Sequence, residues 1–241
     1  MFLPVVFNNR LAAGALTGLL LLGSCAVLDE MARPGTAVGQ PSEARIAAGL
    51  REALLVASRR ASQQVGRPGG YLENDAIRIP LPPTLDDAAT QLRRFGLGGK
   101  ADELQQAMNR AAEAAADEAV AVFADSIRQM RPSDVYAVFT GADDAATSYL
   151  RTTSEDRLRQ RYQPIVAERL RQVQGIDLYR DIASAWNRLP AVTPLETDLE
   201  AFVTEKALDG LFAMIAREEA RIRDDPGARS TEILREVFGS R

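Results

Sequence analysis

A run of apolar and small residues repeats every three or four positions between residues 101 and 130, and this periodicity restricts the fold more than any other feature. The run consists of Leu104, Met108, Ala111, Ala115, Ala119, Val122, Ser126 and Met130. Residues with this spacing share one face of an α-helix. Alanine is abundant along the chain and aromatic residues make up only 6 %, which favours closely packed helices over a β-sandwich. The sequence therefore predicts one long helix over residues 101–130 in an all-α fold.

Further helices are predicted on both sides of this one from capping residues and from glycine or proline stops. They cover residues 42–64, 84–95, 133–141, 143–151, 154–174, 176–188, 197–223 and 230–238. Ser42 is expected to cap the first helix, and Thr84 and Thr197 each begin a capping-box pattern. The resulting fold is an irregular bundle of about eight helices packed around one core.

Two of these helices carry unusual patterns. Pro164 falls inside the 154–174 helix, which it is expected to kink or split, and Gly175 is the expected stop of that helix. The 197–223 helix has apolar residues on two nearly opposite sides. A helix of this kind is usually central and covered by neighbours all round.

Residues 71–83 (YLENDAIRIPLPP) do not follow the helical pattern. Ile77, Ile79 and Leu81 alternate with other residues, and three prolines follow closely. Proline has no backbone N–H to donate to a sheet ladder, so a central strand is excluded. The sequence predicts one short, extended, proline-rich segment that crosses the helices.

The N-terminal residues 1–25 have the pattern of a secretory signal. Arg10 is their only charge, and the apolar run 11–22 would span roughly 18 Å as a helix, short of the ~30 Å bilayer core. Residues 22–25 (LGSC) resemble the bacterial lipobox, in which a leucine and two small residues precede the acylated cysteine. Because Cys25 is the only cysteine and stands at the required position, we expect a lipoprotein acylated there. An ordinary cleaved signal with a chance cysteine is the alternative.

This interpretation divides the chain into three parts. Residues 1–24 are a cleaved lipoprotein signal peptide, residues 25–41 are the lipidated cysteine and a flexible tether, and residues 42–241 form a single helical domain. Three acyl chains, as the lipobox resemblance implies, give a nearly permanent membrane anchor. Ala26 rather than aspartate follows the cysteine, which resembles outer-membrane sorting. We therefore expect a lipid-anchored protein of the bacterial envelope that faces the periplasm.

The residue types that are missing exclude several chemistries. The chain has no histidine, which excludes histidine acid–base catalysis, Ser-His-Asp and Cys-His nucleophiles and histidine metal ligands. One cysteine permits no internal disulfide. Charges of both signs alternate without a basic block, so nucleic-acid binding is not expected. The paired aspartates lack calcium-loop spacing, and we expect no metal and no cofactor.

The chain from about residue 50 to residue 239 resembles a bacterial family designated domain of unknown function 4197. The matching stretches are residues 78–82 (RIPLP), 108–113 (MNRAAE), 143–147 (DDAAT), 203–204 (VT), 207–212 (ALDGLF), 218–219 (EE), 222–223 (IR), Pro226, 228–229 (AR) and 237–239 (VFG). The 116–117 position departs from the pattern, because a proline that would break the long helix is expected there. The resemblance implies a secreted or lipid-anchored helical protein and brings no activity with it.

Glu219 and Lys206 are candidate functional residues on the 197–223 helix. Glu219 lies on an apolar face, where burial would raise its pKa and make it a general acid unless an arginine pairs with it. Lys206 lies on the other stripe, where a desolvated amine can act as nucleophile or base. The alternative for Lys206 is that its stem packs while its ammonium reaches an acid or water.

A second group of candidates surrounds the proline-rich segment. Asn109 and Glu113 are one turn apart at the edge of their helix's apolar stripe, with Arg110 beside them. Together with Arg78 they predict either a polar pocket for an anionic ligand or a clamp in which Arg78 binds Glu113. Asp209 completes this candidate polar cluster.

Three classes of function remain open, in this order of preference. The first is a non-enzymatic envelope protein that binds a protein partner or has a scaffolding role. The second is a carrier or sensor of an apolar, lipid-like ligand, which requires a closed cavity of several hundred Å³. The third is an enzyme that uses carboxylates, arginine or tyrosine, which requires Glu113 or Glu219 to be unpaired and open to solvent. A scaffold requires neither, but has an exposed apolar patch. The sequence leaves the oligomeric state open.

Overall fold

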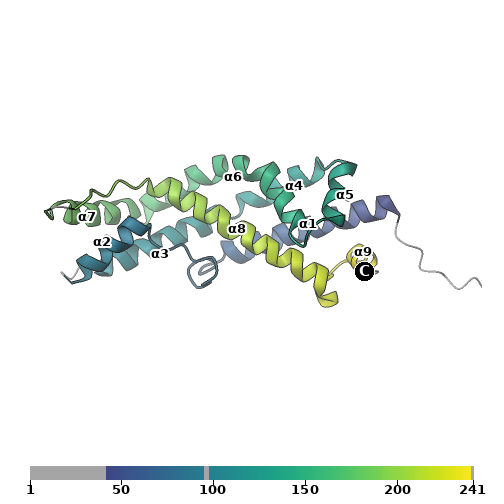
Figure 1. Ribbon diagram of the computed structural model, residues 1–241, viewed down its shortest axis with the longest axis horizontal. Coiled ribbons are helices and arrows are strands. Elements are labelled where there is room, and N and C mark those ends of the chain that lie inside the picture. The colour runs from purple at the N-terminus through teal and green to yellow at the C-terminus, as the bar shows by residue number, and fades with distance from the viewer. Residues whose placement is uncertain (1–41, 95–97, 191, 240–241) are drawn as a thin grey trace, which may run out of the picture. The chain divides into compact units, whose positions relative to one another are not determined.

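The computed structural model describes residues 42–94, 98–190 and 192–239, and this part of the chain contains nine α-helices and no strand (Figure 1). The helices are α1 (Glu43–Gly66), α2 (Pro83–Arg93), α3 (Gly98–Ala115), α4 (Glu118–Arg128), α5 (Pro132–Thr140), α6 (Ala145–Gln172), α7 (Gly175–Asn187), α8 (Leu199–Asp224) and α9 (Glu232–Gly239), with a 3₁₀ turn η1 (Pro226–Ala228) before the last. The all-α prediction is confirmed. The predictions for residues 1–41, including Cys25, lie outside the described residues.

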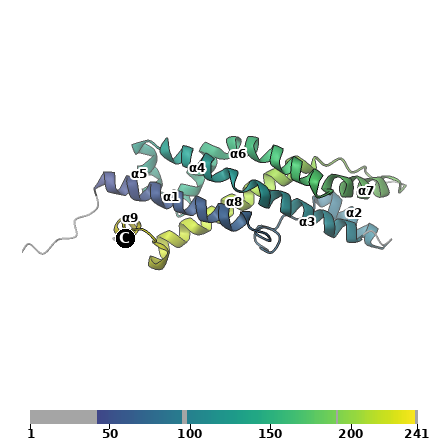
Figure 2. The ribbon, with the colours of Figure 1, turned by 180° about the vertical axis from the view of Figure 1, so that it is seen from behind.

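Helix α8 is the central element of the bundle. It packs against α6, α1 and α3, and both views show it running obliquely across the bundle (Figures 1 and 2). Its buried residues run from Leu199 to Ile222 and include residues on both predicted apolar faces. Phe212 stacks edge-on against Phe123 of α4, with ring centroids 5.7 Å apart. The central position is confirmed, but α8 is not covered all round, because a stripe of exposed residues runs along it: Glu205, Asp209, Ala213, Arg217 and Arg221.

The predicted single helix over residues 101–130 is wrong, because the helix is broken at residues 116–117. There the amide of Ala116 donates to Glu113 O at 3.3 Å, and the amide of Ala119 donates to Ala116 O at 3.2 Å. These bonds span three residues rather than four and tighten the backbone into a turn. Ala116 is fully buried against the C-terminal end of α1. The apolar periodicity continues across the break because both helices turn the same face to the core.

The predicted helices 143–151 and 154–174 form one continuous helix, α6. Ser154 does not cap a new helix; its buried hydroxyl donates to Leu150 O within the helix. Pro164 lies on the exposed side and does not end the helix. The backbone carbonyl that Pro164 leaves without a partner, that of Gln160, belongs to an exposed residue and is open to water.

One of the three predicted helix caps is observed, and two are replaced by a neighbouring residue. Ser42 caps α1 and accepts from Arg45 N at 3.3 Å, as predicted. The capping box at Thr84 is absent, because α2 begins with Pro83 at its first position, where the missing N–H costs nothing. The cap of α8 is Asp198, which accepts from Ala201 N at 2.9 Å, rather than Thr197.

The connection between α1 and α2, residues 67–82, is called the strap. Its first part, residues 67–77, is a series of turns, and its last part, residues 78–82, is extended. Only this last part agrees with the predicted extended segment. Both views show the strap leaving the end of α1 and passing close to α3 and α8 (Figures 1 and 2). Most of the candidate residues lie next to the strap.

Candidate functional site

Asn109 of α3 fastens the extended part of the strap. Its Oδ1 accepts from the backbone N–H of Ile79 at 2.9 Å, and its Nδ2 donates to the carbonyl of Ile79 at 2.9 Å. The side chain is fully buried, so this pair of bonds forms away from water. One carboxamide thus satisfies both backbone groups that a neighbouring strand would bind in a sheet.

Glu113, one turn further along α3, fastens the beginning of the strap. Its Oε1 accepts from the backbone N–H of Tyr71 at 3.2 Å and of Leu72 at 3.4 Å. The residue is buried, and these backbone donors stabilise its negative charge. Asn109 and Glu113 together hold both halves of the strap against α3.

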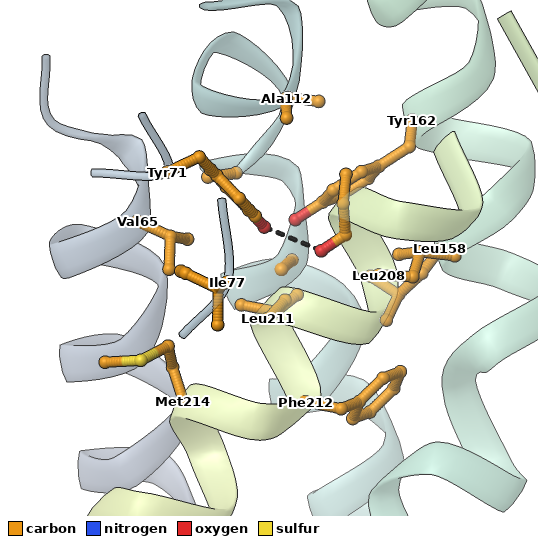
Figure 3. Packing of buried hydrophobic residues seen from close by; sticks show 14 of the residues in the cluster. Val65, Tyr71, Ile77, Ala112, Leu158, Tyr162, Leu208, Leu211, Phe212 and Met214 are labelled. Atoms are coloured by element: carbon orange, nitrogen blue, oxygen red, sulfur yellow. Dashed lines mark hydrogen bonds between the residues drawn. The ribbon is translucent and has the colours of Figure 1, made fainter. Parts of the chain in front are cut away.

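Tyr71 joins the strap to α8. Its hydroxyl donates to Ala207 O at 2.6 Å, and its ring lies against Gly210, where an added Cβ would come within 2.6 Å of Tyr71 Cε1 (Figure 3). Burial, together with the nearby charge of Glu113, raises the pKa of Tyr71 far above its ordinary value. Burial also raises the pKa of Tyr162 on α6, whose buried hydroxyl has no hydrogen-bond partner among the described residues. Both tyrosines are neutral core residues.

Three predicted site residues, Arg78, Lys206 and Asp209, meet in a groove of about 270 Å³ between the strap and α8. Arg78 does not clamp Glu113: its Nε donates to Leu72 O at 2.6 Å and its Nη2 pairs with Asp75. Lys206 pairs with Asp209 at 3.4 Å across an exposed surface. All three charges therefore have partners, and Lys206 is not desolvated.

Arg110 lies on the other side of the strap, in a groove of about 590 Å³ that Glu73 and Glu113 also line. It is exposed and forms no hydrogen bond or ion pair with the part of the chain that the structure describes. The predicted polar cluster is thus divided by the strap. Asn109 lies beneath it, and the remaining residues line two separate grooves.

Glu219 is remote from the strap and binds the first turn of α6. Its Oε1 accepts from Ala146 N at 3.1 Å, and its Oε2 accepts from both the amide and the hydroxyl of Thr147 at 2.8 Å. Arg223, one turn along α8, donates to Oε1 at 2.9 Å, and both side chains are buried. The structure therefore places Glu219 in a buried ion pair, where it also caps a helix of another segment.

This cluster of Thr147, Glu219 and Arg223 unites α5, α6 and α8, because Arg223 also donates to Val138 O at 3.4 Å. The sequence analysis proposed an arginine partner without naming it. The spacing of Glu219 and Arg223, four residues apart on a helix, is the signal that identifies the pair. The interior space beside the pair measures about 10 Å³, which is room for about one water molecule.

The sequence analysis missed an apolar surface groove of about 490 Å³ between the start of α1 and α5. We call it the α1–α5 groove; it is lined by Glu43, Ala44, Ile46, Ala47, Arg51, Pro132, Val135, Tyr136, Phe139 and Thr140. Tyr136 is 72 % exposed and is the one large apolar side chain among the described residues that is strongly exposed. Periodicity alone does not reveal this surface, since Tyr136 belongs to a short helix that also contains the buried Val135 and Val138.

Within residues 42–94, 98–190 and 192–239, no three acidic or cysteine side chains lie close enough together to hold a metal ion. No helix in these ranges is both long and apolar enough to cross a bilayer.

The fold and its polar clusters define an all-helical protein whose buried amide and carboxylate groups fasten its own backbone. The chain belongs to the family described as Protein of unknown function (DUF4197), whose family model matches residues 40–239. This match confirms the family resemblance drawn from the sequence. The chain matches no curated protein and no solved structure.

Proposed function

We propose that this protein is a lipid-anchored component of the bacterial outer membrane that faces the periplasm and has a non-enzymatic binding or scaffolding role. The lipobox pattern before Cys25 supports the anchor, and the following Ala26 supports the outer-membrane location. The folded domain begins at the cap Ser42, so residues 26–41 connect it to the lipid.

The non-enzymatic part of this proposal is supported by Glu113 and Glu219, because both carboxylates form structural hydrogen bonds. An enzyme of this composition needs a carboxylate that is unpaired and open to substrate. Glu113 instead binds two backbone amides of the strap, and Glu219 binds Arg223 and the start of α6. Either carboxylate would have to leave these structural bonds before it could transfer a proton, and the helices that it holds together would then separate.

The small space beside Glu219 does not support a carrier of an apolar ligand. Such a carrier encloses a cavity of roughly 300 Å³ or more, whereas the space between α1 and α8 beside Glu219 measures about 10 Å³. The α1–α5 groove is large enough for a ligand, but it is open at the surface. An exposed apolar surface on a packed domain is the property expected of a binding protein.

The anchor is tested by labelling cells with a radioactive fatty acid and comparing the wild type with Cys25→Ala. We expect label only in the wild type, and we expect the variant to leave the membrane fraction. Equal labelling of the two chains would refute the anchor. Native mass spectrometry of the protein purified from its own envelope tests the role, because a stoichiometric protein supports binding and a co-purified lipid within the fold supports a carrier.

A further inference from the structure

The α1–α5 groove lies at the start of the folded domain. The first two turns of α1 form one of its walls, through Glu43, Ala44, Ile46 and Ala47. Residues 26–41 are all that separates Cys25 from Ser42, and a chain of this length spans at most roughly 60 Å. We propose that this groove is the face with which the domain rests on the phospholipid bilayer that holds its anchor.

This inference rests on the proposed function and names the partner of the exposed surface. Once the lipid is inserted, contact between the groove and the bilayer is intramolecular in effect. A contact of this kind forms at a high effective concentration, so that a modest apolar area suffices. An apolar surface placed next to the anchor therefore meets lipid before it meets any protein in solution.

The chemistry of the groove fits the boundary between headgroups and acyl chains. Tyr136, which is 72 % exposed, carries an apolar ring with a polar hydroxyl, and such side chains are enriched at membrane interfaces. Val135 and Ile46 supply aliphatic groups to the same groove. No long span is required, because a peripheral surface needs to enter only the outermost ~5–10 Å of the acyl region.

Exposed arginines around this end of the domain can bind phosphate headgroups, although the acidic Glu43 also lines the groove. The ion pairs here are Arg45 with Glu236, Arg128 with Asp125, and Arg131 with Asp134. The arginine side chains are 51 %, 70 % and 78 % exposed, whereas those of their acidic partners are 34 %, 40 % and 18 % exposed. Each pair therefore turns its guanidinium outward, and guanidinium groups bind phosphate oxygens through two hydrogen bonds.

The helices that supply these pairs are α1, α4, α5 and α9. They reach the same end of the bundle in both views (Figures 1 and 2). Helix α7, with Trp186, lies at the opposite end. Trp186 is the only tryptophan of the chain, so it reports on a surface that the proposal places away from the lipid.

The test uses the acylated full-length protein in vesicles of phosphatidylethanolamine and phosphatidylglycerol whose acyl chains carry bromine, a quencher of tryptophan fluorescence. The reporter is Tyr136→Trp in a Trp186→Phe background, and the wild type with its native Trp186 is the matched control. Circular dichroism of both chains verifies that the helices are retained. Vesicle flotation measures the anchor in the same samples, independently of the fluorescence.

We expect bromine to lower the emission of the Tyr136→Trp chain about twofold and that of the wild type little, since an interfacial ring lies near the acyl chains. Co-flotation without quenching at position 136 would overturn the inference and leave the anchor standing; contact with a protein or with a second copy would give this result. Equal quenching at positions 136 and 186 would also overturn it, because no particular face would then be bound. Failure to float would refute the anchor and the inference together.

Discussion

Asn109 forms the backbone hydrogen bonds with the strap that a neighbouring strand would form in a sheet. Glu113 accepts hydrogen bonds from the two backbone amides at the beginning of the strap. Both are buried polar residues whose groups are satisfied by backbone that is distant in sequence. A buried polar group without its partner costs more free energy than the bond itself supplies. The cost of losing such a residue is therefore dominated by the backbone groups left behind.

Asn109→Ala should lower the free energy of unfolding by about 2–4 kcal/mol, since it leaves the N–H of Ile79 buried without a partner and its C=O with only the long bond from Gln105. Urea unfolding of the chain without residues 1–25, followed by circular dichroism, measures the change. Gln105→Ala is the matched control, because Gln105 reaches Ile79 O only through a long bond of 3.4 Å. A control as damaging as Asn109→Ala would show that the carboxamide has no special role.

Glu219→Ala and Arg223→Ala should each cost about 3–5 kcal/mol, because each leaves an uncompensated charge in the core. The double substitution should cost about 1–3 kcal/mol less than the sum of the two single substitutions, since the second change removes the charge that the first leaves without a partner. Unfolding by urea of all four chains gives this coupling. Additive costs would mean that the pair does not act as a unit.

At the residue scale, the sequence identified Asn109, Glu113 and Glu219 because each interrupts an apolar stripe with a polar group. It could not identify their partners. Asn109 binds a residue 30 positions earlier, and Glu219 binds amides more than 70 positions earlier. Pairings at this separation depend on how the helices pack, which local patterns do not encode.

At the scale of elements, two positions require glycine because neighbouring segments approach the backbone closely there. Gly210 lets the ring of Tyr71 lie on the backbone of α8. A Cβ at Gly175 would come within 3.0 Å of Leu170 Cδ2. Gln174, not Gly175, adopts the left-handed conformation between α6 and α7, with a φ of 57°. The expected glycine stop is therefore wrong, and the glycine serves packing instead.

Gly210→Ala should destabilise the fold by about 1–3 kcal/mol, because the clash with Tyr71 outweighs the better helix propensity of alanine. Gly99→Ala is the matched control, since a Cβ at that position meets nothing within 4 Å. The control should be neutral or slightly stabilising. Thermal unfolding of the two variants separates the outcomes, and equal melting temperatures would contradict the packing role of Gly210.

The existence of most helices was predictable, whereas several of their junctions were not. The 197–223 pattern yielded α8, and its two apolar faces correctly indicated a central position. The break at Ala116 was missed because the apolar spacing runs through it without a proline or glycine. The junction placed before Ser154 was wrong because a serine has two uses, as a cap or as a donor to the preceding turn.

At the scale of the whole molecule, two of the five tyrosines, Tyr71 and Tyr162, lie fully buried in the core. Burial raises the pKa of both above the ordinary value of 10.0. The neutral phenol is therefore favoured by the folded state. Their contribution to stability is complete below about pH 10, the pKa in the unfolded chain, and is lost as the pH rises above that value.

Alkaline titration should show Tyr71 and Tyr162 ionising only when the chain unfolds. The ultraviolet absorbance of tyrosinate and the circular dichroism of the helices, recorded together, measure the two events. In Tyr71→Phe, one tyrosine fewer should ionise together with unfolding. Ionisation of all five before any loss of helix would contradict the buried positions.

The closure of the strap by side chains also bears on self-association. An extended segment with free N–H and C=O groups is a template on which another polypeptide can add as a strand. In residues 78–83 the amides of Arg78 and Ile79 are already donated, the carbonyl of Ile79 is already bound, and three positions are prolines. The strap, an irregular stretch between two helices, is thereby kept from seeding intermolecular β-structure.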